Sequence, residues 1–267
     1  MQVLKRHNVQ VIGSGPTTVM FAHGFGCDQS MWRLLAPDYA KRYRVLLFDL
    51  MGMGGSDLSR YDRAKYDTLQ GHADDVLEIL DATDSEKAVF VGHSVSAMIG
   101  MLADLKSPQR FEGHVMVGPS PCYINDGDYV GGFERSDIES LLDTLESNYL
   151  GWSSNMAPAI MGAPDQPALG TELTNSFCRT DPEIAKHFAR VTFMSDNRRD
   201  LAGFKAPALI IQSRDDLIAP LAVGDYLHRQ WPQSLLRVVD NVGHCPHLSA
   251  PGPCADAMDE FLASIGR

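Results

Sequence analysis

The chain has 267 residues, 44% of them hydrophobic and 21% charged, which is typical of a globular protein with one sizeable core. Its 34 acidic and 23 basic residues give a formal charge of −11, which disfavours binding to nucleic acid or to an anionic membrane. Five irregularly spaced cysteines, no apolar stretch of ~20 residues and no signal-peptide core predict a reduced, cytoplasmic protein without a membrane span.

Six short apolar runs rich in β-branched residues predict the strands of one sheet. They are Thr18–Ala22, Val45–Phe48, Ala88–Gly92, His114–Val117, Ala208–Gln212 and Leu236–Val239. They lack polar alternation, as expected of parallel strands that are buried on both faces. Helical patterns lie between them, at Leu69–Leu80 for example, and Asp256–Ile265 closes the chain. The alternation predicts an α/β fold with a mostly parallel sheet, and the first dozen residues can add an antiparallel hairpin at one edge.

The stretch from about Asn125 to Asp200 interrupts this alternation, because it holds helix signals and no convincing strand. Ser136-Asp-Ile-Glu139 has the pattern of a capping box, and Pro167 and Pro182 stand where a first helical turn tolerates proline. We therefore expect residues 125–200 to form a helical lid inserted into a core made of residues 1–124 and 201–267. Most large apolar residues of the lid should pack its helices together, while three are candidates to line a pocket beneath it: Phe133, Trp152 and Phe193.

A predicted strand runs directly into Gly92-His-Ser94-Val-Ser96 and then into a helix of small residues. This is the context of a nucleophile elbow, in which a sharp turn lifts a serine hydroxyl above the edge of the sheet. The pattern therefore predicts Ser94 as a nucleophile. Ser96 stands where glycine is usual, and the alternative is that Ser94 only caps an ordinary helix.

A second predicted strand enters the glycine-rich turn His23-Gly-Phe25-Gly26. Backbone N–H groups in such a turn can stabilise the oxyanion of a tetrahedral intermediate without reorganising. We expect the N–H groups of Phe25 and Val95, the residue after the proposed nucleophile, to form this oxyanion hole. The alternatives are a plain turn or, in another context, a zinc ligand at His23.

Asp216 and His244 each follow a predicted strand, at the edge where catalytic groups of open α/β sheets collect. His244 would accept the proton of Ser94, and Asp216 would hold the imidazole in one tautomer. Asp215 is the competing carboxylate, and Asp216 is preferred because it lies four residues before Pro220, as in related enzymes.

Three other features have simpler explanations than a site of their own. His23 and His93 flank the predicted site and are expected to be packing or turn residues. The segment 244–247 contains metal-binding atoms, but no second ligand cluster has zinc spacing, so no metal is expected. The glycine-rich segment 48–57 lacks the third glycine of a dinucleotide loop and the lysine of a P-loop, so no cofactor is expected.

Taken together, these motifs resemble the α/β-hydrolase family over essentially the whole chain. More narrowly, four segments resemble the bacterial stress-response regulator RsbQ and the plant strigolactone and karrikin receptors: His23–Trp32, Gly92–Ala97, Met116–Tyr123 and Gly243–Leu248. Gly-His-Ser-Val-Ser is itself typical of those proteins. The resemblance implies a four-helix lid in a V over a closed apolar pocket, and a triad of Ser94, Asp216 and His244. It also implies slow hydrolysis of a small hydrophobic compound, sometimes coupled to signalling through a partner protein of the phosphatase type.

Two classes of function follow as hypotheses. A serine at the elbow, where some relatives carry aspartate, indicates acyl transfer through an acyl-enzyme. The first hypothesis is therefore a hydrolase of a small hydrophobic carboxylic ester or lactone. The second is a signalling component that binds or slowly hydrolyses such a ligand and then acts on a partner protein. A carbon–carbon bond hydrolase or a perhydrolase stays open as well, because fold and triad do not determine the substrate.

Overall fold

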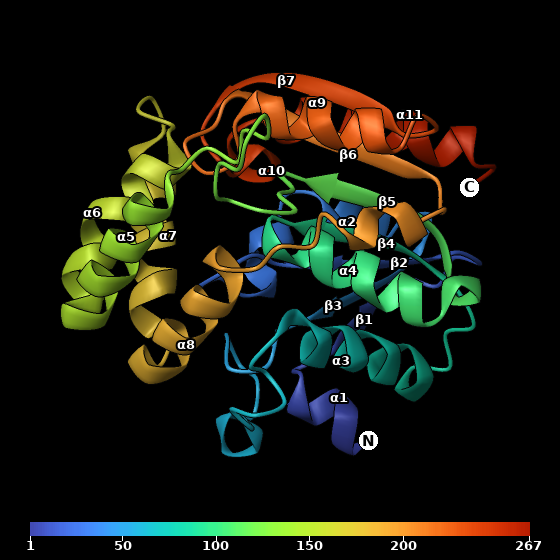
Figure 1. The fold of residues 1–267 in the computed structure, drawn as a ribbon. Helices are drawn as coiled ribbons and strands as arrows, with labels where there is room; N and C mark the ends of the chain where they lie inside the picture. The colour runs from blue at the N-terminus through green and yellow to red at the C-terminus, as the bar shows by residue number, and fades with distance from the viewer.

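A computed structural model describes residues 1–267 and has a seven-stranded sheet at its centre (Figure 1). The strands are β1 (Gln10–Ile12), β2 (Thr18–Ala22), β3 (Arg44–Phe48), β4 (Ala88–His93), β5 (Phe111–Val117), β6 (Ala208–Asp215) and β7 (Leu235–Val242). Their order in the sheet is β1-β3-β2-β4-β5-β6-β7, and only β1 runs antiparallel to its neighbour. The predicted α/β fold with a mostly parallel sheet is confirmed.

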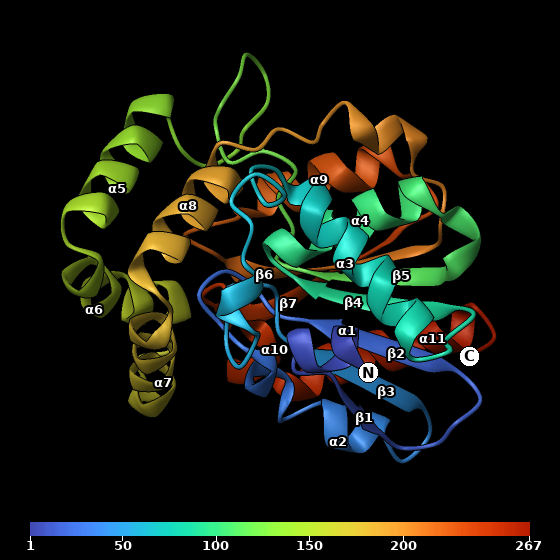
Figure 2. The same ribbon diagram turned by 90° about the horizontal axis from the view of Figure 1, so that it is seen from below.

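Helices cover both faces of this sheet (Figure 2). They are α1 (Gln2–Arg6), α2 (Ala36–Tyr39), α3 (Leu69–Ala82), α4 (Val95–Lys106), α9 (Leu221–Gln230), α10 (Pro246–Ser249) and α11 (Pro251–Ser264). Successive strand side chains point to opposite faces, so Met20 packs in one core with α3, α4 and α9. Its neighbours Val19 and Phe21 pack in a second core with α2 and α11. Both faces are therefore dry along the central strands, which explains why β2 and β4 lack polar alternation.

The first dozen residues do not form the expected antiparallel hairpin. Gln2–Arg6 is a helix, the chain turns at Asn8, which has a positive φ of 48°, and only Gln10–Ile12 joins the sheet. The reason is tertiary: Arg6 pairs with Glu78 on α3, and the fully buried His7 lies 3.7 Å from an oxygen of Asp75 on the same helix. These contacts hold the first residues against α3 instead of at the edge of the sheet.

Four helices lie between β5 and β6 and gather beyond the carboxyl ends of the strands (Figures 1 and 2). They are α5 (Arg135–Ser147), α6 (Tyr149–Met161), α7 (Pro167–Arg179) and α8 (Pro182–Phe193). Helices α7 and α8 begin at the predicted prolines. Helix α5 begins before the predicted capping box, because Glu134 and Asp137 form the box and Ser136 lies inside the helix.

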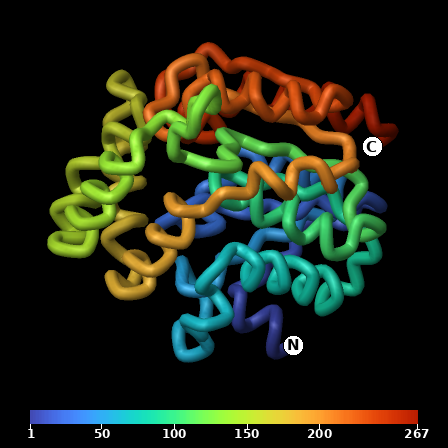
Figure 3. Tube along the Cα trace, viewed as in Figure 1, coloured from blue at the N-terminus to red at the C-terminus, as the bar shows by residue number.

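These four helices occupy the predicted lid segment, and the division into lid and core stays our interpretation of the chain. The C-terminus lies on the side of the molecule away from them (Figure 3). No helix combines the length and the apolar character that crossing a bilayer requires.

Candidate active site

Ser94 occupies a sharp turn between β4 and α4. Its backbone has φ 56° and ψ −124°, a strained conformation for a residue other than glycine, and its N–H donates to the carbonyl of Val117 over 2.8 Å. Gly92 makes the turn possible, because a Cβ there would lie 2.6 Å from the carbonyl carbon and oxygen of Ser96. The local sequence thus forces the strand, turn and helix into close contact and turns the Ser94 side chain toward the edge of the sheet.

Three side chains form a continuous buried chain of hydrogen bonds at this edge. Ser94 Oγ lies 2.8 Å from His244 Nε2, and His244 Nδ1 lies 2.7 Å from Asp216 Oδ2. The other carboxylate oxygen, Oδ1, accepts the N–H groups of Ile218 at 2.8 Å and Ala219 at 3.1 Å. Because a carboxylate accepts and does not donate, Nδ1 carries the imidazole proton and Nε2 is left to accept from the serine. The arrangement can move a proton from Ser94 to His244.

The competing carboxylate of Asp215 points elsewhere. Its residue is exposed, whereas Asp216 is buried against His244. Asp215 contributes only its backbone carbonyl, which accepts the N–H of Gly243 over 2.7 Å.

The two backbone groups expected to bind an oxyanion lie beside the serine turn. Val95 is the first residue of α4, so its N–H has no acceptor within the helix. The N–H of Phe25 donates to no protein group. Gly24 lets the two segments approach, because a Cβ there would lie 3.3 Å from Ser94 Cβ and 2.6 Å from His93 Nδ1. Two free donors next to the serine turn have the chemistry of an oxyanion hole.

His23 and His93 were expected to pack or turn, and both also make specific hydrogen bonds. His23 Nδ1 donates to the carbonyl of Gly24 at 2.8 Å, and its Nε2 accepts the N–H of Leu50 at 3.0 Å. His93 Nε2 donates to the backbone carbonyl of His244 at 2.8 Å. Burial lowers the pKa of both imidazoles, so both are neutral. Their hydrogen bonds hold the oxyanion turn and the backbone at His244 in position.

An apolar pocket of about 30 Å³ lies beside the serine. It is lined by Phe25, Cys27, His93, Ser94, Tyr123, Trp152, Ile160, Leu173, Phe177, Thr192, Phe193, Ile218, His244 and Cys245. The ring of Phe25 lies in this wall and packs against the rings of Trp152, Phe177 and Phe193, at centroid distances of 6.2, 5.7 and 6.2 Å. Helices α6, α7 and α8 therefore supply much of its wall.

Two of the three proposed pocket residues, Trp152 and Phe193, line this cavity, and Phe133 does not. Phe133 lies in the turn before α5, where its N–H donates to the carbonyl of Tyr123 and its carbonyl accepts from Asn125. Its apolar character was visible in the sequence, but its position outside the helices was not.

Comparison with known proteins decides the family. The model of the alpha/beta hydrolase family matches residues 19–257. The chain belongs to the α/β hydrolase family. This hydrolase is 41% identical over 250 residues to the Karrikin insensitive 2 receptor CA of Petunia hybrida, covering 93% of each chain. It is 37% identical over 261 residues to the Strigolactone esterase D14 of Arabidopsis thaliana, covering 97% of each chain. The solved structure of a hydrolase from Oleispira antarctica superposes with a TM-score of 0.95 at 43% identity, covering 98% and 96% of the two chains.

The likeness to the strigolactone and karrikin receptor hydrolases, expected from the motifs, is thus confirmed. The narrower likeness to RsbQ stays a prediction.

Sequence reasoning assigned no role to Tyr123, which lines the pocket of this hydrolase. Burial raises the pKa of its phenol to about 12, and the nearby Ser94 hydroxyl lowers it only in part. The phenol is therefore protonated at neutral pH and can donate a hydrogen bond toward the serine. Its segment was noted for its resemblance to relatives, and only the fold reveals that it returns to the nucleophile.

Two thiols complete the pocket wall. Cys27 follows the oxyanion turn and Cys245 follows His244, and both are buried. Burial raises the pKa of both, so they are neutral thiols that present small apolar surfaces to the pocket. The structure has no group of three or more His, Cys, Asp or Glu side chains arranged to bind a metal ion.

Proposed function

We propose that this α/β hydrolase is a serine hydrolase that cleaves a small hydrophobic carboxylic ester or lactone through an acyl-enzyme on Ser94. The observation that carries the proposal is the buried chain from Ser94 Oγ to His244 to Asp216, with distances of 2.8 and 2.7 Å. A hydroxyl held in this way can lose its proton as it attacks a carbonyl carbon.

The reaction follows from these positions. His244 Nε2 accepts the proton while Ser94 Oγ bonds to the carbonyl carbon, and the N–H groups of Phe25 and Val95 bind the oxyanion. Collapse of the intermediate breaks the ester C–O bond, and His244 returns the proton to the leaving oxygen. A water molecule, deprotonated by His244, then releases the acid and restores the serine. With a lactone, the leaving hydroxyl stays attached to the acyl chain and one hydroxy acid is produced.

The groups around His244 can stabilise the imidazolium that forms transiently in the reaction. Asp216 lies 2.7 Å from Nδ1 and is held by two backbone N–H groups, so it can stabilise the imidazolium without moving. The neighbouring His93 and His247 are buried, which lowers their pKa values, that of His247 to about 3. Both are therefore neutral and add no repelling charge.

The pocket and the relatives support a small apolar substrate. Ten of the 14 residues that line the pocket are hydrophobic. Two similar proteins carry the names Strigolactone esterase D14 and 3-oxoadipate enol-lactonase 1, from Arabidopsis thaliana and Acinetobacter baylyi, at 37% and 24% identity. An ester or lactone is the bond that a serine, an imidazole and an oxyanion hole cleave.

A second candidate function is ligand sensing. Binding or slow hydrolysis of a ligand would change the arrangement of α5–α8, and a partner protein would bind the changed surface. The observation that favours it is the small volume of the pocket, about 30 Å³, because a ligand larger than this has to move the lining helices when it binds. Several relatives are named as receptors.

The proposal is tested with p-nitrophenyl butyrate and three proteins: the wild type, Ser94→Ala and Ser120→Ala. Ser120 is a buried serine whose hydroxyl donates to the carbonyl of Cys122 and not to an imidazole. We expect Ser94→Ala to lower kcat by about 10³-fold or more, and Ser120→Ala to retain activity. Undiminished turnover by Ser94→Ala would refute the proposal. Negligible turnover by the wild type, together with ligand-dependent shifts of Tm, would favour sensing.

A further inference from the structure

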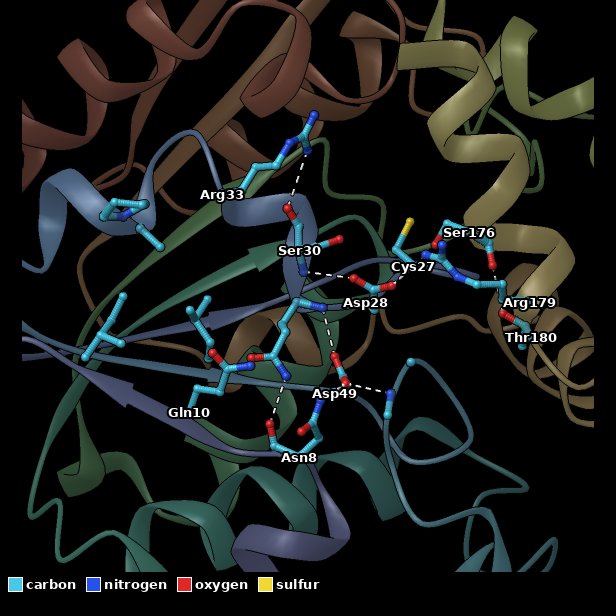
Figure 4. Close-up of a pocket in the computed structure, with 17 residues that line it drawn as sticks. Asn8, Gln10, Cys27, Asp28, Ser30, Arg33, Asp49, Ser176, Arg179 and Thr180 are labelled. Atoms are coloured by element: carbon cyan, nitrogen blue, oxygen red, sulfur yellow. Dashed lines mark hydrogen bonds and ion pairs between the residues drawn. The ribbon is translucent and has the colours of Figure 1, made fainter. Parts of the chain in front are cut away.

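Figure 4 shows a second, larger cavity, which shares the lining residue Cys27 with the serine pocket. This outer cleft has a volume of about 720 Å³ and 17 lining residues, four of them hydrophobic. They come from β1, from the 3-10 helix η1 (Gln29–Trp32), from the loop after β3 and from the end of α7. Figure 4 shows Ser30, Arg33 and Asp28 on one side of the cleft and Ser176, Arg179 and Thr180 on the other.

The wall between the outer cleft and the serine pocket is one residue thick. Cys27 lines both cavities. On the opposite side, Ser176 lines the outer cleft and the next residue, Phe177, lines the serine pocket. Pockets that hold organic ligands usually measure roughly 300–1,000 Å³, so the inner pocket alone is too small for an ester and the outer cleft is not.

Several contacts hold this wall closed. Ser176 Oγ donates to the carbonyl of Gly26 at 2.9 Å, and the buried ring of Phe177 packs on that glycine, where a Cβ would lie 2.5 Å from the ring. Two ion pairs near the surface, Arg179 with Asp28 and Arg33 with Glu172, also join α7 to this segment. Ion pairs of this kind are weak. A ligand that passes through the wall has to break the contacts of Ser176 and Phe177.

The floor of the outer cleft is polar and rigid. Both oxygens of Asp49 are occupied, by the N–H groups of Gln29 and Gly55 and by the side-chain amide of Asn8. Gln29 donates from Nε2 to the carbonyl of Asn8, which fixes its amide orientation. Its Oε1 is buried from solvent and has no hydrogen-bond partner. The polar groups of the cleft that a ligand can reach belong to its exposed lining residues, Gln10 and Ser30 among them.

The charged groups at the rim are already paired with each other. Arg33 lies 2.6 Å from Glu172 on α7, and Arg179 pairs with Asp28. The carboxylate of Asp49 on the floor has neutral donors and no cationic partner. A neutral ligand rich in hydroxyl groups therefore fits the cleft better than an anion.

We propose that the outer cleft is a subsite of the same active centre that takes the uncharged, hydroxyl-bearing part of the ester, while the inner pocket takes a small apolar acyl group. The inference rests on the proposed ester hydrolase function, and it narrows the substrate class to esters of short apolar acids with polyhydroxy alcohols. In such a complex the helices that line the inner pocket move apart to admit the acyl group, and the chain of the ligand passes between Cys27 and Phe177. Its hydroxyl groups contact the exposed polar residues of the outer cleft.

The test compares two esters of one acid, glycerol 1-monobutyrate and butyl butyrate, by titration of released butyrate. Ser30→Trp fills the outer cleft at an exposed position. Its matched control is Glu86→Trp, at an exposed position in a cleft of about 640 Å³ at the amino ends of the strands. We expect the wild type to prefer the glycerol ester by about tenfold in kcat/KM, equivalent to one or two hydrogen bonds. Ser30→Trp should abolish that preference, and Glu86→Trp should keep it.

Equal kcat/KM for the two esters, or equal effects of the two tryptophan variants, would overturn the subsite while leaving the hydrolase proposal intact. A binding measurement tests the subsite independently of the hydrolase activity. Saturation-transfer NMR of glycerol 1-monobutyrate on Ser94→Ala should show contact that is lost in Ser94→Ala/Ser30→Trp. If the wild type hydrolyses neither ester, the NMR result decides alone. Contact that Ser30→Trp removes supports the subsite, and no contact, or contact that the substitution leaves unchanged, overturns the subsite.

Discussion

The backbone N–H of His244 donates to the carbonyl oxygen of Ile160, 2.8 Å away, and so joins the proposed catalytic base to the end of α6. Gly243, the preceding residue, has a φ of 108°, and a Cβ on it would lie 1.9 Å from the carbonyl oxygen of Met161. No side chain fits at this approach. The histidine loop and α6 are therefore coupled, and a movement of α6 displaces the imidazole from Ser94.

Gly243→Ala should break this coupling. We expect kcat on p-nitrophenyl butyrate to fall at least a hundredfold, because misplacing a reacting group by about 1 Å costs that much. Strain at the positive φ should also lower Tm. The control is Gly252→Ala on α11, where a Cβ meets no atom within 4 Å and the helix favours alanine. Unchanged kcat in Gly243→Ala would show that the loop is not held by α6.

Adjacent carboxylates provide a matched pair for testing the role of Asp216. Asp216→Asn keeps the shape of the side chain but replaces an acceptor oxygen near His244 Nδ1, so the imidazole loses its tautomer and its counter-charge. We expect kcat to fall by about 10³- to 10⁴-fold. Asp215→Asn, at an exposed position, should stay within twofold of the wild type. Equal losses in the two variants would contradict the assignment.

Ser96 shows how a departure from the usual elbow pattern is accommodated. Its hydroxyl donates to the carbonyl of His23 at 2.5 Å and ties α4 to the oxyanion turn. Ser96→Ala leaves that buried carbonyl without its donor, so we expect the free energy of unfolding to fall by about 1–3 kcal/mol, with a lower kcat as well. Ser264→Ala, at a partly buried serine near the C-terminus, serves as the control in urea titrations. A decrease in the free energy of unfolding no larger than that of the control would show that the hydrogen bond of Ser96 contributes little to stability.

The sheet was predictable from sequence because both of its faces are buried. Runs such as Ala88–Gly92 are apolar at every position, and that pattern needs no knowledge of neighbouring elements. The structure extends most of these runs, β6 to Asp215 for example, because polar residues at carboxyl ends can still pair. The N-terminal hairpin was wrong for the opposite reason: contacts of Arg6 and His7 with α3 decide that segment, and no local pattern encodes them.

The candidate site was also predictable from the sequence only in part. The positions of Ser94, Asp216 and His244 follow from strand ends, so sequence brought them to one edge of the sheet. The choice between Asp215 and Asp216 depended on which residue turns inward, and the structure places Asp216 there. The pocket wall was less accessible, because which face of a lid helix points inward depends on packing between α6, α7 and α8. Phe133, Tyr123 and Cys27 lie in loops, and which loop residues reach the pocket also depends on the fold. Phe133 was therefore misplaced, and Tyr123 and Cys27 were overlooked.

His72 makes stability depend on pH. It is buried on α3 between Tyr66 and Phe188, both ring nitrogens lack partners, and burial lowers its pKa to about 3. The unfolded chain, in which the pKa is about 6.5, therefore takes up the proton first. The contribution is complete above pH 6.5 and is lost as pH falls toward 3.

We expect the free energy of unfolding of the wild type to drop by about 2 kcal/mol more than that of His72→Met between pH 6.5 and pH 5, measured by urea titration. Other buried histidines act equally in both proteins, so the difference isolates His72. Parallel curves for the two proteins would mean that folding does not lower the pKa of this imidazole.

The most direct test of the account is the covalent intermediate. Wild-type protein mixed with p-nitrophenyl acetate, quenched in acid within the first turnover and digested, should carry one acetyl group on the peptide that contains Ser94, as seen by mass spectrometry. Asp216→Asn should accumulate it more slowly, and Ser94→Ala should carry none. Hydrolysis that proceeds with no acetyl group on Ser94, or with one on another residue, would contradict a mechanism through this serine.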